Sequence, residues 1–189
     1  MPAARYKYIP KMRSLCPCAG SRAGMLCGPA IFNKRIVMQI EPYTEKYDNE
    51  IISLILSIQN DENKLGLSLG EQPGLLDIKR CYRRSGGEFR VALSDDKVIG
   101  TIGLMLKARQ CAVLKKIFVQ KKFCSQGVGL ALYNTLLTYA KGADIRHIIP
   151  PPSVARVSHR FYERAGFYKI AKNQLPISYI YPDRDSILY

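Results

Sequence analysis

The chain has 189 residues, 47% of them hydrophobic and 23% charged, which is enough for one domain with a well-packed core. No apolar run is as long as a membrane-spanning helix requires, so we expect a cytoplasmic protein without a membrane partner. The formal net charge of +14 would suit nucleic-acid binding, but half of this excess lies in residues 1–37, which contain seven Lys and Arg and no acidic residue. The rest of the chain is moderately basic, which suits an anionic cofactor and does not predict a nucleic-acid partner.

The first 37 residues differ in composition from everything that follows. They are punctuated by Pro, Gly and Cys and show no clear periodicity. We therefore expect residues 1–37 to be a basic, disordered extension and residues 38–189 to form the folded domain. An Arg-rich segment without acids also fits an organellar targeting sequence loosely, and that alternative stays open.

The six cysteines predict neither a disulfide framework nor a metal site. Cys16, Cys18 and Cys27 lie in the extension at spacings unlike those of zinc ligands, and the other three are scattered singly. This usage is typical of a reducing cytoplasm.

Hydrophobic periodicity divides the remaining residues into interleaved strands and helices, with turn signals between them. The predicted elements, in chain order, are a strand at 35–40, helices at 43–59 and 75–83, strands at 89–93, 98–106 and 111–119, a helix at 130–140, a strand at 145–149, a helix at 153–165, and strands at 167–171 and 186–189. This order predicts an α/β (or α+β) domain around one mixed sheet.

The most informative segment lies between the predicted strand at 111–119 and the helix at 130–140. Its polar loop ends in Gly127 and Gly129 and leads directly into the helix. The first N–H groups of a helix lack intrahelical partners and carry partial positive charge, and glycines let an anion approach the backbone closely. The loop therefore predicts either a tight turn or a phosphate or pyrophosphate site. It lacks the Lys-Ser/Thr of a P-loop and the third glycine of a dinucleotide fingerprint.

Two motifs together resemble those of GNAT family N-acetyltransferases. The run Cys124-Ser125-Gln126-Gly127-Val128-Gly129 resembles the family loop Arg/Gln-x-x-Gly-x-Gly/Ala, and Arg160–Phe167 resembles Phe-Tyr-x-x-x-Gly-Phe. The resemblance covers roughly residues 39–189. It implies a single GNAT-like domain with a mixed, mostly antiparallel central sheet of about six or seven strands, flanked by about four helices, whose last strand the chain end cuts short. Cys124 departs from the family, which usually has Arg or Gln there.

The resemblance also implies acetyl-CoA as the cosubstrate. Backbone groups of Ile117, Phe118 and Val119 would pair with its pantetheine like another strand. The pyrophosphate would be held by the loop and the first turn of the helix, namely Cys124, Ser125, Gln126, Gly127, Val128, Gly129 and Leu130.

One catalytic residue follows from the resemblance. Tyr162 matches the family tyrosine that can protonate the departing thiolate, and an ordinary phenol is protonated at neutral pH. The alternative role is packing against the sheet beside Phe161 and Phe167. No general base is identifiable, because no acid near in sequence occupies a signature position; these acids are Glu88, Asp95, Asp96 and Glu163. His147 lies in an apolar strand, which favours packing.

The implied function is an N-acetyltransferase that moves an acetyl group from acetyl-CoA to a primary amine of a small molecule or a protein by direct transfer. The alternative is a non-catalytic acyl-CoA-binding or regulatory protein of the same fold, which the departure at Cys124 favours. An RNA-contacting protein has only the charge in its favour, because no RNA-binding motif is present. The acceptor stays open, as does the choice between a monomer and a homodimer.

Overall fold

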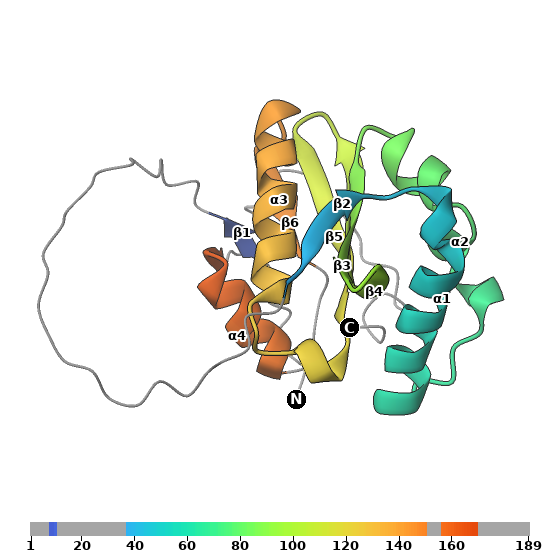
Figure 1. Cartoon of the computed structure of the whole chain (residues 1–189). Coiled ribbons are helices and arrows are strands. Elements are labelled where there is room, and N and C mark those ends of the chain that lie inside the picture. The colour runs from blue at the N-terminus through green and yellow to red at the C-terminus, as the bar shows by residue number, and fades with distance from the viewer. Residues whose placement is uncertain (1–7, 11–36, 151–155, 170–189) are drawn as a thin grey trace, which may run out of the picture.

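The computed structural model describes residues 8–10, 37–150 and 156–169 of the chain, and a mixed five-stranded sheet lies at its centre (Figure 1). The strands are β2 (Gln39–Pro42), β3 (Glu88–Ser94), β4 (Lys97–Ala108), β5 (Cys111–Val119) and β6 (His147–Ile149), in the order β2-β3-β4-β5-β6. Neighbours from β2 to β5 are antiparallel, and β5 and β6 are parallel. The predicted α/β class and the mostly antiparallel mixed sheet are confirmed.

A second, two-stranded sheet joins the two ends of the described chain. β1 (Tyr8–Pro10) pairs antiparallel with β7 (Phe167–Lys169), and β1 also contacts β6. Three residues of the segment expected to be disordered therefore form a strand. The rest of that segment lies outside the described residues, as does the strand predicted at 186–189.

Two tight hairpins connect β3, β4 and β5, as the turn signals predicted. Asp95 and Asp96 both have a positive φ between β3 and β4, and Gln110 has one between β4 and β5. Short polar side chains tolerate this left-handed conformation better than branched ones do. Gly103 in β4 is required by packing, because a Cβ there would lie 2.6 Å from the ring of Tyr82.

Two helices cover one face of the sheet, on the right in Figure 1. They are α1 (Asp48–Ser57), which continues into a π-helical turn at Ile58–Glu62, and α2 (Pro73–Leu76). The predicted helix at 75–83 is interrupted at Asp77, whose φ of −147° and ψ of 75° are not helical. The Asp77 carboxylate accepts a hydrogen bond of 2.8 Å from the backbone N–H of Arg80, which starts a separate helical turn at Lys79–Arg83.

The opposite face is covered by α3 (Val128–Gly142) and α4 (Arg156–Arg164) (Figure 1). Each face has its own core cluster. Leu132, Leu136 and Ala140 of α3 pack on Leu104 and Leu114 of the sheet. The cluster on the other face contains Ile51, Ile55, Leu75, Ile78, Tyr82, Phe89 and Phe118.

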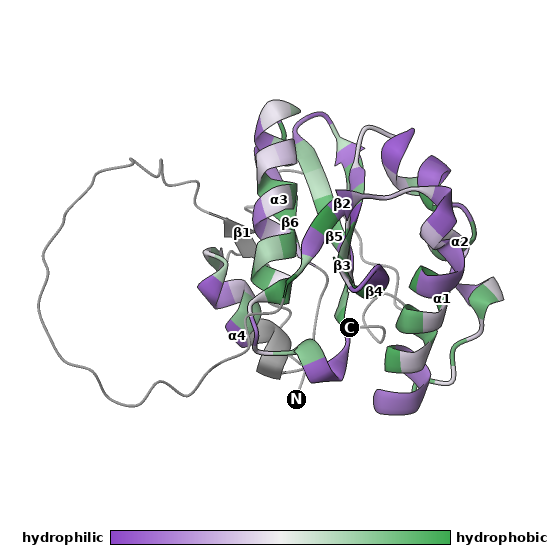
Figure 2. Cartoon of the chain, in the orientation of Figure 1, coloured by the Kyte–Doolittle hydropathy of each residue, from purple (hydrophilic) through white to green (hydrophobic). Residues whose placement is uncertain are grey.

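Apolar and polar bands alternate along α1 and α3 (Figure 2). The buried residues of these helices are mainly apolar, among them Ile51, Leu54 and Ile55 of α1 and Leu132, Leu136 and Ala140 of α3, as in helices with one face on a core. Within the part of the chain that the structure describes, no helix is long and apolar enough to cross a membrane.

Candidate active site

The parallel strands β5 and β6 stay together over only part of the length of β5. The described pairs run from Cys111↔His147 to Val113↔Ile149, where β6 ends, while β5 continues to Val119. On its other edge β5 remains paired with β4 as far as Val119↔Gly100. The last part of β5 therefore offers one edge to a ligand that can hydrogen-bond like a strand. Ile117, Phe118 and Val119 lie on this part, where the resemblance placed the pantetheine.

A β-bulge distorts β5 just before these residues. In the pairing with β4, Gly103 opposes Lys115 and Thr101 opposes Phe118, so Ile102 faces two residues of β5. The extra residue is Lys116, which has a φ of +51° and whose carbonyl accepts a 2.8 Å hydrogen bond from the Thr101 hydroxyl.

The bulge reverses the alternation of side chains along β5. Leu114 before it and Ile117 after it both pack in the cluster under α3, and Phe118 packs in the cluster under α1. Sequence reasoning missed this irregularity, because its regular strand at 111–119 took no account of an extra residue.

The predicted anion loop leads from β5 into α3, and its last residue is the N-cap of the helix. Gly127 has a φ of +86°, and beyond its own chain neighbours no atom of a described residue lies within 4 Å of the position that a Cβ would take there. Its carbonyl accepts the first helical hydrogen bond, from Ala131 N–H at 2.9 Å. The N–H groups of Val128, Gly129 and Leu130 belong to the first turn, where a helix offers donors and partial positive charge to an anion. The residues present fit a pyrophosphate.

Two lysine side chains near the start of this loop add positive charge to it. Lys121 and Lys122 are exposed in a short 3₁₀ turn at Lys121–Phe123. A hydrogen bond of 2.6 Å from Gln126 Nε2 to the Lys122 carbonyl joins this turn to the end of the loop. Sequence reasoning missed these two lysines, although a Lys-Lys pair in a loop without acidic residues is visible in the sequence. The two lysines bring positive charge two and three residues before Cys124.

Cys124 is exposed, and its thiol lies 3.6 Å from the carbonyl oxygens of Val119 and Gln120. Partial desolvation, with a smaller contribution from the Glu62 carboxylate, raises the pKa of the thiol. It is therefore a neutral group at physiological pH, and it neither attracts nor repels an anion in the loop.

Tyr162 is 3% exposed and lies in an aromatic cluster between α3 and α4. Its ring contacts those of Phe161 and Phe167 edge-on, with centroid distances of 5.4 and 5.5 Å. Phe161 and Phe167 also contact Tyr133 of α3, and Phe161 would lie 3.5 Å from a Cβ placed at Gly129. α4 therefore packs on the first turns of α3, which brings Tyr162 to the same end of the sheet as the loop.

The acidic residues considered as general bases do not gather at this end. Glu88 is buried at the start of β3, where it lies 3.7 Å from Arg83 and 3.9 Å from Arg90. Asp95 and Asp96 are exposed in the β3–β4 turn, and Glu163 is exposed on α4. His147 is half-buried in β6, and its Nδ1 makes no hydrogen bond to a described residue.

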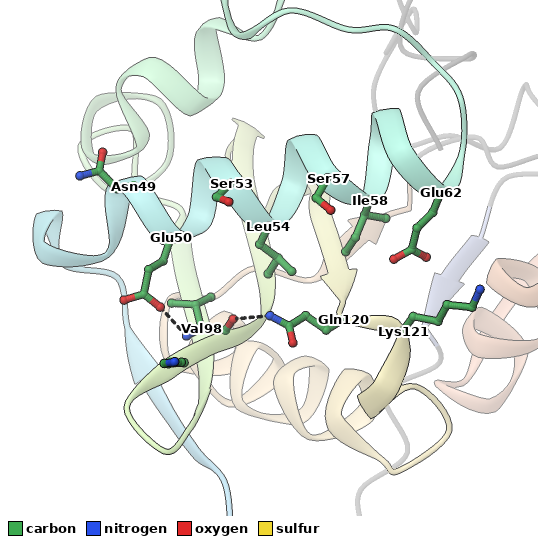
Figure 3. A pocket seen from close by; sticks show the side chains of 11 residues that line it. Asn49, Glu50, Ser53, Leu54, Ser57, Ile58, Glu62, Val98, Gln120 and Lys121 are labelled. Carbon is green, nitrogen blue, oxygen red and sulfur yellow. Dashed lines mark hydrogen bonds between the residues drawn. The ribbon is translucent and has the colours of Figure 1, made fainter.

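A pocket of about 420 Å³ lies on the α1 side of the loop (Figure 3). Its walls are Asn49, Glu50, Ser53, Leu54, Ser57, Ile58 and Glu62 from the helical side, and Lys97, Val98, Gln120 and Lys121 from the sheet and loop. Glu50 accepts from Val98 N–H at 2.8 Å, which joins the two walls, and Gln120 Nε2 donates to the Val98 carbonyl at 3.1 Å within the wall of the sheet and loop. None of the predicted cofactor residues lines this pocket, so it is a separate, polar feature beside the loop.

Comparison with known proteins agrees with this geometry. The model of the acetyltransferase (GNAT) family matches residues 55–167, which include β5, the loop, α3 and α4. A curated relative, the probable N-acetyltransferase family 8 member 5 of Mus musculus, is 31% identical over 107 residues. The aligned stretch is 53% of this chain and 47% of the relative, so the chain spans less than half of that protein's length.

Solved structures share the fold over most of their length. An acetyltransferase of the GNAT family from Staphylococcus aureus Mu50 is 32% identical, with a TM-score of 0.72 over 78% of this chain and 94% of that one. An acetyltransferase from Streptococcus agalactiae 2603 is 33% identical, with a TM-score of 0.70 over 78% and 93% of the two chains.

A more distant structure, from Brucella melitensis and 17% identical, is a GNAT acetyltransferase in complex with acetyl-CoA, with a TM-score of 0.54 over 71% and 88% of the chains. That likeness concerns the fold. The family match over residues 55–167 and the shared fold show that the chain belongs to the acetyltransferase (GNAT) family.

Proposed function

We propose that the protein is an N-acetyltransferase that moves an acetyl group from acetyl-CoA to a primary amine by direct transfer. The observation that carries the proposal is that the end of β5, whose edge past Val113 pairs with no described strand on the β6 side, leads to the left-handed Gly127 at the start of α3. A strand edge followed by an anion site suits a ligand with two amide groups and a pyrophosphate. The name of the mouse relative, a probable N-acetyltransferase, supports the type of transfer.

In this proposal the main chain binds the cosubstrate. Ile117 and Val119 offer backbone groups to the pantetheine amides, and the N–H groups at residues 125–130 bind the pyrophosphate. Lys121 and Lys122 raise the local positive potential, which compensates for the uncharged Cys124. Because backbone donors are fixed in place, they bind with little loss of conformational entropy.

Tyr162 is the proposed proton donor to the departing thiolate. Edge-on contacts with Phe161 and Phe167 hold its ring in one orientation, and burial keeps bulk water away from it. A fixed donor in a dry environment transfers its proton more effectively than a mobile exposed one. Packing alone is the competing role for the same ring.

A non-catalytic acyl-CoA-binding protein is the second candidate function, and the specific observation in its favour is Cys124. Its thiol contacts carbonyls of its own loop and offers no charge where the family usually has a cationic or amide side chain.

Turnover separates the two functions. The full chain is incubated with acetyl-CoA and a panel of primary amines, and acetylated products are detected by mass spectrometry. Formation of an N-acetyl product that requires the protein supports the transferase. Binding of acetyl-CoA without any product across amines, amino acids and peptides supports the non-catalytic alternative.

A further inference from the structure

The bulge residue of β5 is a buried lysine. Lys116 is 6% exposed and has a φ of +51°, so an ammonium group and a strained backbone occur at one position. Both features cost free energy, and buried charges and sparsely populated backbone conformations are concentrated at functional sites. Its position at the bulge, immediately before Ile117, places it beside the part of β5 that extends past β6.

The Lys116 side chain extends toward α2. Its Nζ donates to Gln72 Oε1 at 2.6 Å, and Gln72 is the N-cap residue of α2 and is itself 3% exposed. The other amide atom, Gln72 Nε2, is buried and makes no hydrogen bond to any described residue. Buried donors in folded proteins nearly always have a hydrogen-bond acceptor, so Nε2 is a donor that a bound ligand could use.

These groups lie on the side of the sheet opposite the proposed proton donor. Lys116 donates to Gln72 at the start of α2, whereas Tyr162 is a residue of α4 and packs in the cluster under α3. The helices α1 and α2 cover one face of the sheet, and α3 and α4 cover the other (Figure 1). In the proposed function the loop before α3 and the free edge of β5 are occupied by the cosubstrate. The acceptor must therefore reach the acetyl group from the side of α1 and α2.

We propose that Lys116 and Gln72 are specificity-determining residues that select acceptor amines bearing a carboxylate close to the amine, as in a free amino acid. The inference rests on the proposed function and names the acceptor class of the same site. The Lys116 ammonium attracts the carboxylate and repels an acceptor with a second ammonium group in its place, and Gln72 Nε2 donates a second hydrogen bond to the carboxylate. No covalent change at either residue is required.

If Lys116 has only a structural role, connecting α2 to β5, different effects of its substitution are expected. Loss of such a tie would lower stability and affect all acceptors alike. A recognition role instead changes the discrimination between acceptors of the same shape and different charge, and it does so mainly through KM.

The test compares matched acceptors: free amino acids and the corresponding C-terminal amides, which keep the shape and lose the charge. For the wild-type chain we expect kcat/KM to favour the acid by about tenfold or more. Lys116→Met is expected to abolish this preference by raising KM for the acid, with kcat for the amide little changed. Lys116→Arg should keep the sign of the preference, and the control Lys141→Met, which removes a charge on the exposed end of α3, should leave it unchanged.

Calorimetric titration with acetyl-CoA is run on each variant, and thermal unfolding is recorded. If Lys116→Met does not fold, Gln72→Met tests the second donor and is expected to reduce the preference for the acid about threefold to tenfold. Turnover in which acid and amide react equally well, or in which the preference survives in both variants, overturns this inference and leaves the proposed function standing. Binding of acetyl-CoA without turnover of any acceptor overturns the proposed function and this inference with it.

Discussion

The two faces of the sheet carry different kinds of groups at the candidate site. On the side of α3 and α4 the buried side chains are mostly apolar or aromatic, and the polar side chains of the loop before α3, such as Lys121, Lys122 and Gln126, are exposed. On the side of α1 and α2 polar side chains are buried, namely Gln59, Gln72 and Lys116.

This difference distinguishes binding by the main chain from recognition by individual side chains. Binding by the main chain depends on conformation and tolerates changes of side chain, which explains how Cys124 can stand where the family usually has a polar or cationic residue. Recognition by buried side chains depends on their identity, because an unsatisfied buried donor costs about 1–3 kcal/mol. The face of α3 and α4 therefore suits a cosubstrate common to a family, and the face of α1 and α2 suits an individual acceptor.

The largest effect is expected at Tyr162. Tyr162→Phe removes the hydroxyl and keeps the ring contacts, so kcat should fall about 10²–10⁴-fold while the Kd for acetyl-CoA changes little. Steady-state kinetics and calorimetry measure the two quantities. Equal loss of turnover and affinity would assign Tyr162 to packing, and unchanged kcat would exclude it as the proton donor.

Gly127→Asp should weaken acetyl-CoA binding about 100-fold or more, because it combines a strained φ of +86° with a negative charge at the anion site. Gly127→Asn separates the two causes, since Asn tolerates this conformation and carries no charge. Gly142→Asp, at the exposed end of α3, is the matched control. Retained affinity in Gly127→Asp would mean that the pyrophosphate is bound elsewhere.

Cys124→Arg should strengthen acetyl-CoA binding about threefold to tenfold, because a guanidinium on the exposed loop adds a charged partner for the pyrophosphate. Calorimetry at low ionic strength measures the gain, which should shrink as salt is added. Cys124→Ser should show no gain. If Cys124→Arg binds no better than wild type, the main chain alone determines the affinity.

The smallest effect concerns the reactivity of the same thiol. Because desolvation and Glu62 raise the pKa of Cys124, less thiolate is present at any given pH. The pH midpoint for alkylation of Cys124 by iodoacetamide, followed by mass spectrometry, should therefore lie above that of the same sequence as an unstructured peptide. Glu62→Gln should move the midpoint down toward the peptide value, and a shift in the opposite direction would contradict the assigned cause.

Much of the face of α3 and α4 could be predicted from the sequence. Local signals predict it and the strands beneath it: the alternation at 89–93, the turn at Asp95 and Asp96, and Gly127 before an amphipathic helix. Each of these reflects the conformational preference of a few consecutive residues. The order of strand, glycine loop and helix around Gly127 was predictable for this reason.

The face of α1 and α2 was not predictable in the same way. The predicted helix at 75–83 is broken at Asp77, where a side chain caps a new turn, and the bulge at Lys116 has no signal in a strand that alternates acceptably without it. The contact of Lys116 with Gln72 joins residues 44 positions apart. Such contacts depend on the tertiary arrangement, which single-sequence patterns do not contain.

The proposed function depends first on binding of the pyrophosphate of acetyl-CoA at the start of α3. Calorimetric titration of the full chain with acetyl-CoA, and with adenosine as a fragment lacking the pyrophosphate and pantetheine, tests it most directly. We expect saturable binding of acetyl-CoA that weakens sharply in Gly127→Asp, and little binding of adenosine. Absence of binding at millimolar acetyl-CoA, or equal affinity in wild type and Gly127→Asp, would contradict it.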